Sequence, residues 1–243
     1  MARKDYKGKF LVDHPLCCFC GGQTQSETID HFPTRAFFDK RQWPEGYEFP
    51  ACKKCNDITR DAELVITALS RVHEQDGSTS NNADVRKALK GLNNNRPDIV
   101  KEMMPNPIQQ AKYPTALNIG PKVDKEIKLF GHKLGLALYY FHTGRIVPEK
   151  GGISIPRWYS NAEQLEGKVP RFIGQQVYLE RQKIDLSDQF NYEYTADEEK
   201  NMAVFVTSFR FSFLIPIIAT EDEKTLSSEM QQYFEKPFNH SQV

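Results

Sequence analysis

The five cysteines of this chain lie in two short segments. Cys17, Cys18 and Cys20 form the first group, Cys52 and Cys55 form the second, and the rest of the 243 residues contains none. Two pairs at Cys-x-x-Cys spacing are typical of a zinc site, because each pair can form a tight turn that directs two thiolates at one ion. We predict a structural Zn²⁺ bound by Cys17, Cys20, Cys52 and Cys55, with Cys18 left over; free thiols or a redox pair are the alternatives.

Two residues able to activate water or bind a hard metal ion lie between the cysteine pairs, and a third follows them. These residues are Asp30, His31 and Asn56. Histidine titrates near neutral pH and can accept a proton from water, whereas aspartate and asparagine offer oxygen ligands that Mg²⁺ prefers. In an extended segment, Asp30 and His31 point to opposite faces, so Asp30 could hold a divalent ion while His31 faces water. A base and a metal together meet the needs of phosphodiester hydrolysis.

The order of these motifs resembles the HNH endonucleases, whose ββα-metal motif lies within a treble-clef zinc fold. Asp30-His31-Phe32-Pro33 and Pro50-Ala51-Cys52-Lys53-Lys54-Cys55-Asn56 carry the likeness, over about a quarter of the chain. It implies a metal-dependent endonuclease with His31, Asp30 and Asn56 as catalytic residues. In this scheme His31 is the general base, and Asp30 and Asn56 bind a catalytic Mg²⁺ or Mn²⁺.

One position departs from the family pattern. HNH enzymes usually carry an asparagine in the second strand, nine residues before the metal-ligand position, and here that residue is Tyr47. Tyrosine can also donate and accept a hydrogen bond, so Tyr47 is a candidate to brace the loop that holds His31.

The charge balance of the chain does not favour a broad polyanion-binding surface. Its 32 basic residues are matched by 32 acidic residues, so any contact with phosphate groups must be local. Lys53, Lys54 and Arg60 lie beside the predicted site and are candidates to bind nucleic acid, DNA more than RNA. An ordinary solvated surface role is about as common for such residues.

Hydrophobic periodicity predicts the elements that position these residues. A hairpin with a long connection fits the segment between the cysteine pairs, because Pro33 and Pro44 exclude a continuous helix. A helix ending near residues 76–77 follows, with one apolar face formed by Ile58, Ala62, Val65, Leu69 and Val72. We also predict a short helix over residues 83–90, stopped by Gly91, and a long helix from an Asp124 cap to Gly144.

Beyond Gly151-Gly152 the pattern alternates, which is the period of a β-strand. The alternating residues are Ile173, Val177 and Leu179, then Phe190, Tyr192 and Tyr194, then Phe205, Phe209, Phe211, Phe213 and Ile215. We expect an antiparallel sheet packed on the long helix. The predicted fold class is therefore α+β. The resemblance implies a zinc-bound module of the HNH type over residues 1–62, and residues 63–243 would form an α+β accessory or interaction region.

Two functions stay open at this point. The resemblance favours an endonuclease, in a bacterial or phage setting such as anti-phage defence; the alternative is a non-catalytic zinc module that binds nucleic acid or protein. The set Asp30, His31 and Asn56 favours the enzyme, because a purely structural zinc fold does not need all three. Residues 63–243 could bind a protein partner in either case. With no secretory signal and no apolar span, we expect a cytoplasmic protein that does not enter a membrane.

Overall fold

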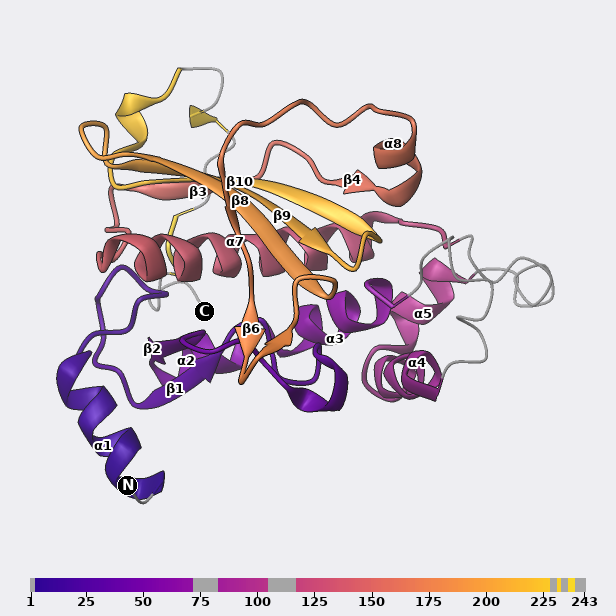
Figure 1. Cartoon of the computed structure of the whole chain (residues 1–243), viewed down its shortest axis with the longest axis horizontal. Coiled ribbons are helices and arrows are strands. Elements are labelled where there is room, and N and C mark those ends of the chain that lie inside the picture. The colour runs from indigo at the N-terminus through magenta and orange to yellow at the C-terminus, as the bar shows by residue number, and fades with distance from the viewer. Residues whose placement is uncertain (1–2, 72–82, 105–116, 228–230, 233–235, 239–243) are drawn as a thin grey trace.

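The computed structural model of the chain describes residues 3–71, 83–104, 117–227, 231–232 and 236–238 (Figure 1). It has an α+β fold in which the long helix α7 lies between an antiparallel sheet and the N-terminal elements. The N-terminal elements are α1 (Arg3–Asp13), β1 (Thr28–His31), the 3₁₀ helix η1 (Asp39–Arg41), β2 (Glu48–Ala51), α2 (Lys53–Asp57) and α3 (Arg60–Leu69). The predicted fold class is confirmed.

Helices α4 (Ala83–Asn95), α5 (Pro97–Met103) and α7 (Pro121–Thr143) follow. The apolar face predicted for the first long helix is largely confirmed, since Ala62, Val65 and Leu69 are buried. That helix is broken, however, because Thr59 has φ −101° and ψ 8° between α2 and α3. The expected positions of Val72 and of the helix end at residues 76–77 lie outside the described residues.

Two predicted helix boundaries were wrong. Helix α4 continues through Gly91 to Asn95, where a single glycine lowers helix stability by only about 1 kcal/mol and does not end the helix. Helix α7 begins at Pro121, with Gly120 as its N-cap. Asp124 instead accepts a hydrogen bond from Trp158 Nε1 (3.0 Å). The predicted end is confirmed, because Gly144 has φ 68°, the left-handed conformation that a C-terminal glycine provides.

The C-terminal region forms the predicted antiparallel sheet. Its strands are β3 (Gly152–Ser154), β4 (Tyr159–Ser160), β5 (Gln175–Val177), β8 (Phe190–Asp197), β9 (Met202–Phe209) and β10 (Phe213–Thr220), in the order β3-β10-β9-β8-β5 with β4 paired to β10. The same region also contains helix α8 (Asn161–Leu165), a small hairpin of β6 (Glu180–Arg181) and β7 (Ile184–Asp185), and the 3₁₀ helix η3 (Glu223–Thr225). The row from Phe205 to Ile215 is not one strand, because Arg210 and Phe211 take positive φ in a turn that exposes Phe211.

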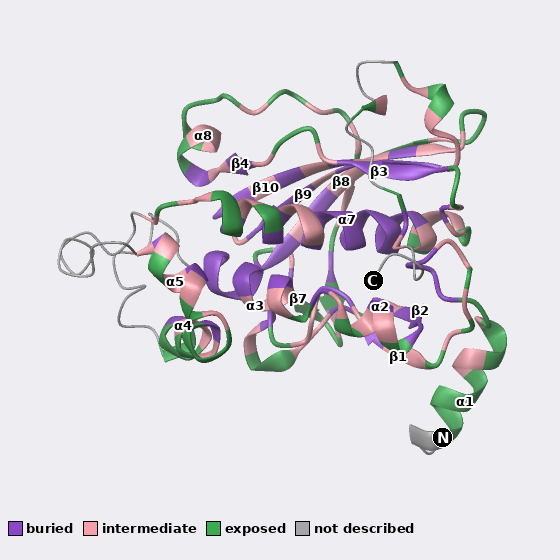
Figure 2. Ribbon diagram, turned by 180° about the vertical axis from the view of Figure 1, so that it is seen from behind, coloured by how far each residue is buried: buried purple, intermediate pink, exposed green. Residues whose placement is uncertain are grey.

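Helix α7 packs closely on the sheet because two glycines one turn apart face it. A Cβ atom at Gly131 would lie 2.8 Å from Ile155 Cδ1, and one at Gly135 would lie 2.7 Å from Ile217 Cγ2. Figure 2 shows α7 mostly buried along its length, whereas α1 is largely exposed. Among the described helices, none combines the length and the apolar character needed to cross a bilayer.

A buried lysine joins the opposite side of α7 to the N-terminal elements. Lys133 has no exposed side-chain surface, and its Nζ lies 2.6 Å from Asp30 Oδ2 and 3.8 Å from Glu63 Oε1. It also donates a hydrogen bond to Thr59 Oγ1 (2.9 Å) and lies over the rings of Phe19 and Phe32. The regions 1–62 and 63–243 therefore share a buried ion pair as well as an apolar core, while their status as separate domains stays a prediction.

We predict that Lys133→Met lowers the free energy of unfolding by about 3–5 kcal/mol, because it leaves Asp30 as a buried charge without its cation. Lys128→Met, on the same helix, is the control: Lys128 is 45% exposed and pairs with Asp124, so its loss should cost less than about 1 kcal/mol. Urea unfolding measures both. The double variant Asp30→Asn, Lys133→Met should recover part of the loss; equal, small effects of the two lysine substitutions would contradict the assignment.

Candidate metal centre and active site

The four predicted zinc ligands come together in the folded chain. The Sγ atoms of Cys17, Cys20, Cys52 and Cys55 all lie within 4.8 Å of one another, and all four residues are buried. Four sulfurs bound tetrahedrally to zinc at about 2.3 Å would lie about 3.8 Å apart, so the cluster is compatible with a structural Zn²⁺. Among the described residues, no other group of three or more cysteine, histidine or acidic side chains converges in this way.

Local backbone geometry explains why the cysteine pairs can converge. Gly21 and Gly22 follow the first pair with φ 66° and 73°, a left-handed conformation that favours glycine. Cys52 is the N-cap of α2, and its Sγ accepts a hydrogen bond from Cys55 N (3.4 Å). Cys18 lies outside the cluster, and burial raises the pKa of its thiol well above the usual value, so it stays protonated.

The hairpin between the pairs places His31 opposite an acidic residue. Strands β1 and β2 pair antiparallel with His31 directly opposite Glu48, and the distance from His31 Nε2 to Glu48 Oε1 is 3.0 Å. Arg35 also contacts the imidazole at Nε2. The side chain of His31 retains 18% of its surface exposed. Burial and the charge of Arg35 lower the pKa of His31 from its usual value, against the opposing effect of Glu48.

Asp30 has a different partner. Its carboxylate is 7% exposed and forms the ion pair with Lys133 described above. The two groups are close enough for an ion pair, but Asp30 Oδ2 does not meet the geometry of a hydrogen bond. Asn56 is partly exposed and its Nδ2 donates to Thr28 Oγ1 (2.9 Å). Because Mg²⁺ keeps several water ligands, an enclosed carboxylate already paired with an ammonium group does not fit a hydrated divalent ion in this arrangement.

Tyr47 does not brace the loop that holds His31. Its hydroxyl lies 2.7 Å from the hydroxyl of Tyr192, and its ring stacks on Phe141 with centroids 4.8 Å apart. The neighbouring Glu48 contacts His31 instead, because alternate residues of a strand point to opposite faces. The hydrogen bond to Tyr192 also connects β2 to strand β8 of the sheet.

The three basic residues predicted to bind nucleic acid lie at the start of the helical segment after the hairpin. Lys53 and Arg60 are exposed and Lys54 is partly exposed. Arg60 pairs with Asp57 at 3.3 Å, with both side chains more than half exposed; such a pair contributes little to stability. These residues are accessible, and their role in binding stays a prediction.

Three residues around the site were missed by reasoning from the sequence: Glu48, Arg35 and Lys133. Glu48 could have been found only by knowing the pairing register of β1 and β2, which depends on a long connection. Arg35 lies in an irregular loop between the buried Phe32 and Phe37, with no periodic pattern to single it out. Lys133 lies within an apolar helix, where a lysine is an exception that signals a buried acidic partner.

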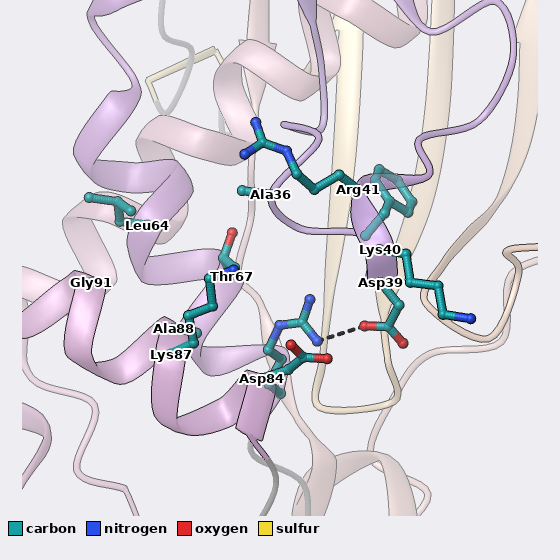
Figure 3. Close-up of a pocket in the computed structure, with 12 residues that line it drawn as sticks. Ala36, Asp39, Lys40, Arg41, Leu64, Thr67, Asp84, Lys87, Ala88 and Gly91 are labelled. Atoms are coloured by element: carbon teal, nitrogen blue, oxygen red, sulfur yellow. Dashed lines mark hydrogen bonds and ion pairs between the residues drawn. The ribbon is translucent and has the colours of Figure 1, made fainter.

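A separate pocket of about 290 Å³ lies between residues 36–41, α3 and α4 (Figure 3). Arg71, in its wall, donates to Asp39 Oδ1 and to Phe37 O, both at 2.8 Å. Arg210 from the β9–β10 turn also donates to Asp39 Oδ1 (2.9 Å). These bonds fix the segment that follows the His31 loop, and no predicted catalytic residue lines the pocket.

Comparison of the chain with protein-family models, with curated proteins and with solved structures gives no match. The likeness to HNH endonucleases therefore rests on the motifs alone. The structure shows a buried four-cysteine module compatible with zinc, followed by helices and an antiparallel sheet.

We predict that the purified protein contains about one zinc ion per chain and that Cys52→Ser loses most of it, because a serine hydroxyl is a poor replacement for a thiolate ligand. Elemental analysis measures the metal, and thermal unfolding measures the loss of stability that should accompany it. Cys18→Ala is the matched control, a buried cysteine outside the cluster, and should keep its zinc. Equal zinc contents in the two variants would show that the cluster is not the binding site.

Proposed function

We propose that this protein is an endonuclease that hydrolyses phosphodiester bonds in nucleic acid, with His31 as its general base. The observation that carries the proposal is the pairing of His31 with Glu48 across a hairpin flanked by the two cysteine pairs. A histidine oriented by a carboxylate is an arrangement that hydrolases use to activate a nucleophile. Arg35 beside the ring supplies a cation where a phosphate would be attacked.

The proposed reaction follows from the two ring nitrogens of His31. When Nε2–H donates to Glu48, Nδ1 keeps its lone pair and can take a proton from water. The lowered pKa of His31 keeps the imidazole neutral and able to act as a base near pH 7. The hydroxide formed attacks phosphorus, and the bond to the leaving oxygen breaks with its electron pair on that oxygen, which takes a proton from solvent. His31 then releases its own proton to solvent. Arg35 offsets the charge that develops on the phosphate oxygens.

The resemblance to HNH endonucleases also implies that Asp30 and Asn56 bind a catalytic Mg²⁺ or Mn²⁺. That prediction would require Asp30 to leave its ion pair with Lys133, so no step above depends on it. We further propose that the substrate is DNA in preference to RNA, and that Lys53, Lys54 and Arg60 contact its phosphates. Residues 63–243 would bind a protein partner, and the protein would act in anti-phage defence.

A specific observation favours a second candidate, a non-catalytic zinc module that binds nucleic acid or protein. Asp30 and Asn56 each have a structural partner, Lys133 and Thr28 respectively. Neither residue therefore requires a catalytic role, and an enzyme would depend on His31 with its neighbours Glu48 and Arg35.

We predict that His31→Ala lowers cleavage by about a hundredfold or more, because the attacking water loses its base. The assay incubates the zinc-loaded protein with plasmid DNA and with total RNA, in Mg²⁺, in Mn²⁺ and in EDTA, which also measures any metal requirement. His14→Ala is the control, since His14 lies in the same module but its Nδ1 contacts Tyr140 Oη (2.7 Å). Undiminished cleavage by His31→Ala would refute the assignment; no cleavage by the parent protein would favour the second candidate.

Glu48→Gln should lower kcat by about tenfold or more with little change in KM, because an amide can present N–H to the imidazole and favour the wrong tautomer. Tyr6→Phe is the comparison: the Tyr6 hydroxyl donates to the same carboxylate, at Oε2, but does not touch the imidazole through that bond. Steady-state kinetics on the cleaved substrate separates the two variants. If Glu48→Gln retained full kcat, Glu48 would not orient the base.

A further inference from the structure

An indole ring beside His31 lies between two arginines from distant parts of the chain. The Cζ atoms of Arg35 and Arg181 lie 3.8 Å and 3.9 Å from the centre of the Trp43 ring. Two guanidinium groups cannot occupy the same space over one ring, so they cover its two faces. The His31 ring meets Trp43 edge-on, with centroids 5.0 Å apart and an interplanar angle of 87°.

Arg181 belongs to the hairpin β6–β7 of the C-terminal region, which reaches from the sheet toward the N-terminal elements in Figure 1. Arg181 Nη1 donates to Trp43 O (3.1 Å). Glu45 N donates to Glu180 O (3.2 Å), and Gln182 N donates to Glu45 Oε1 (3.2 Å). These three hydrogen bonds hold the hairpin against the loop that connects β1 to β2, so the C-terminal region adds a cation to the surroundings of His31.

Stacking on a ring leaves a guanidinium able to bind an anion. Stacking involves the flat face of the guanidinium group. The N–H donors of the group lie in its plane and can still form bidentate hydrogen bonds to phosphate. Arg181 is partly exposed, and its described hydrogen bond uses one of five donors. Arg35 Nη2 lies against the imidazole, 3.4 Å from Nδ1, and a neutral imidazole nitrogen is a weaker acceptor than a phosphate oxygen. A phosphodiester next to His31 would therefore be a better partner for Arg35 than the imidazole is.

We propose that Arg35 and Arg181, spaced by Trp43, form a clamp for the phosphate backbone of a nucleic acid. Arg35 holds the phosphate beside His31, and Arg181 holds a neighbouring phosphate. This inference rests on the proposed nuclease function and deepens it, because it makes the β6–β7 hairpin part of the substrate site. A purely structural sandwich, which only docks the hairpin, is the competing explanation.

The test measures binding without cleavage, in the His31→Ala background. Fluorescence anisotropy of a labelled DNA or RNA oligonucleotide is followed over a range of salt concentrations for the parent, Arg181→Met and Arg157→Met. Arg157 is the matched control: its Cζ also lies over an aromatic ring, Tyr159, at 4.4 Å, and it pairs with Glu163.

Arg181→Met should weaken binding and reduce the slope of log affinity against log salt by about 0.7–0.9, the value for one phosphate contact. Arg157→Met should leave both unchanged.

Arg181→Lys should restore most of the salt slope, because it keeps the charge. If Arg181→Met kept the parent affinity and slope while its unfolding midpoint fell, the sandwich would be structural and the clamp would be refuted. Absence of any binding by the parent would refute it too. Arginine-dependent binding with no cleavage by the protein carrying His31 would overturn the nuclease proposal but not the clamp, so the two failures can be distinguished.

Discussion

Four cysteine sulfurs in a buried site cannot all carry charge unless a cation lies between them, and this constraint governs the N-terminal part of the molecule. The cluster joins the knuckle of residues 17–20 to the start of α2, and the strands β1 and β2 lie between these points in the chain. Two four-residue strands alone would be marginal in water. We therefore expect that Zn²⁺ in this cluster would help to keep His31 and Glu48 opposite each other.

The second constraint is the buried charge of Lys133. A lysine with no exposed surface must be paired, and its partners are Asp30 on β1 and Glu63 on α3. Burial raises the pKa of Glu63 to about 7, against the effect of the nearby lysine, so one carboxylate of the cluster is easily protonated. Asp30, adjacent to His31 in sequence, thus holds β1 onto helix α7, and the position of His31 depends on the packing of the whole chain.

Features set by short spacing could be predicted from the sequence. The cysteine spacing identified the cluster, the apolar face of Ala62, Val65 and Leu69 identified a helix, and Gly144 identified the end of α7. The alternating aromatic residues identified the sheet, although the turn at Arg210 and Phe211 was missed, because two positive φ values in non-glycine residues have no sequence signal. These elements are determined by interactions between residues close in the chain.

Features that depend on long-range pairing could not be predicted. The roles of Glu48 and Tyr47 depend on a strand register, and a shift of one residue exchanges the two faces. The partner of Asp30 lies on α7, and Arg181 reaches Trp43 from the other end of the chain. No local pattern encodes these contacts, because they form only once the sheet, α7 and the zinc module are packed together.

X-ray absorption at the zinc edge of the purified protein would show whether sulfur alone binds the metal, because it reports the ligand atoms and their distances. A site built by Cys17, Cys20, Cys52 and Cys55 gives a first shell of sulfur alone, at about 2.3 Å. A first shell containing nitrogen or oxygen at about 2.0–2.1 Å would show that the four cysteines do not form the zinc site on their own.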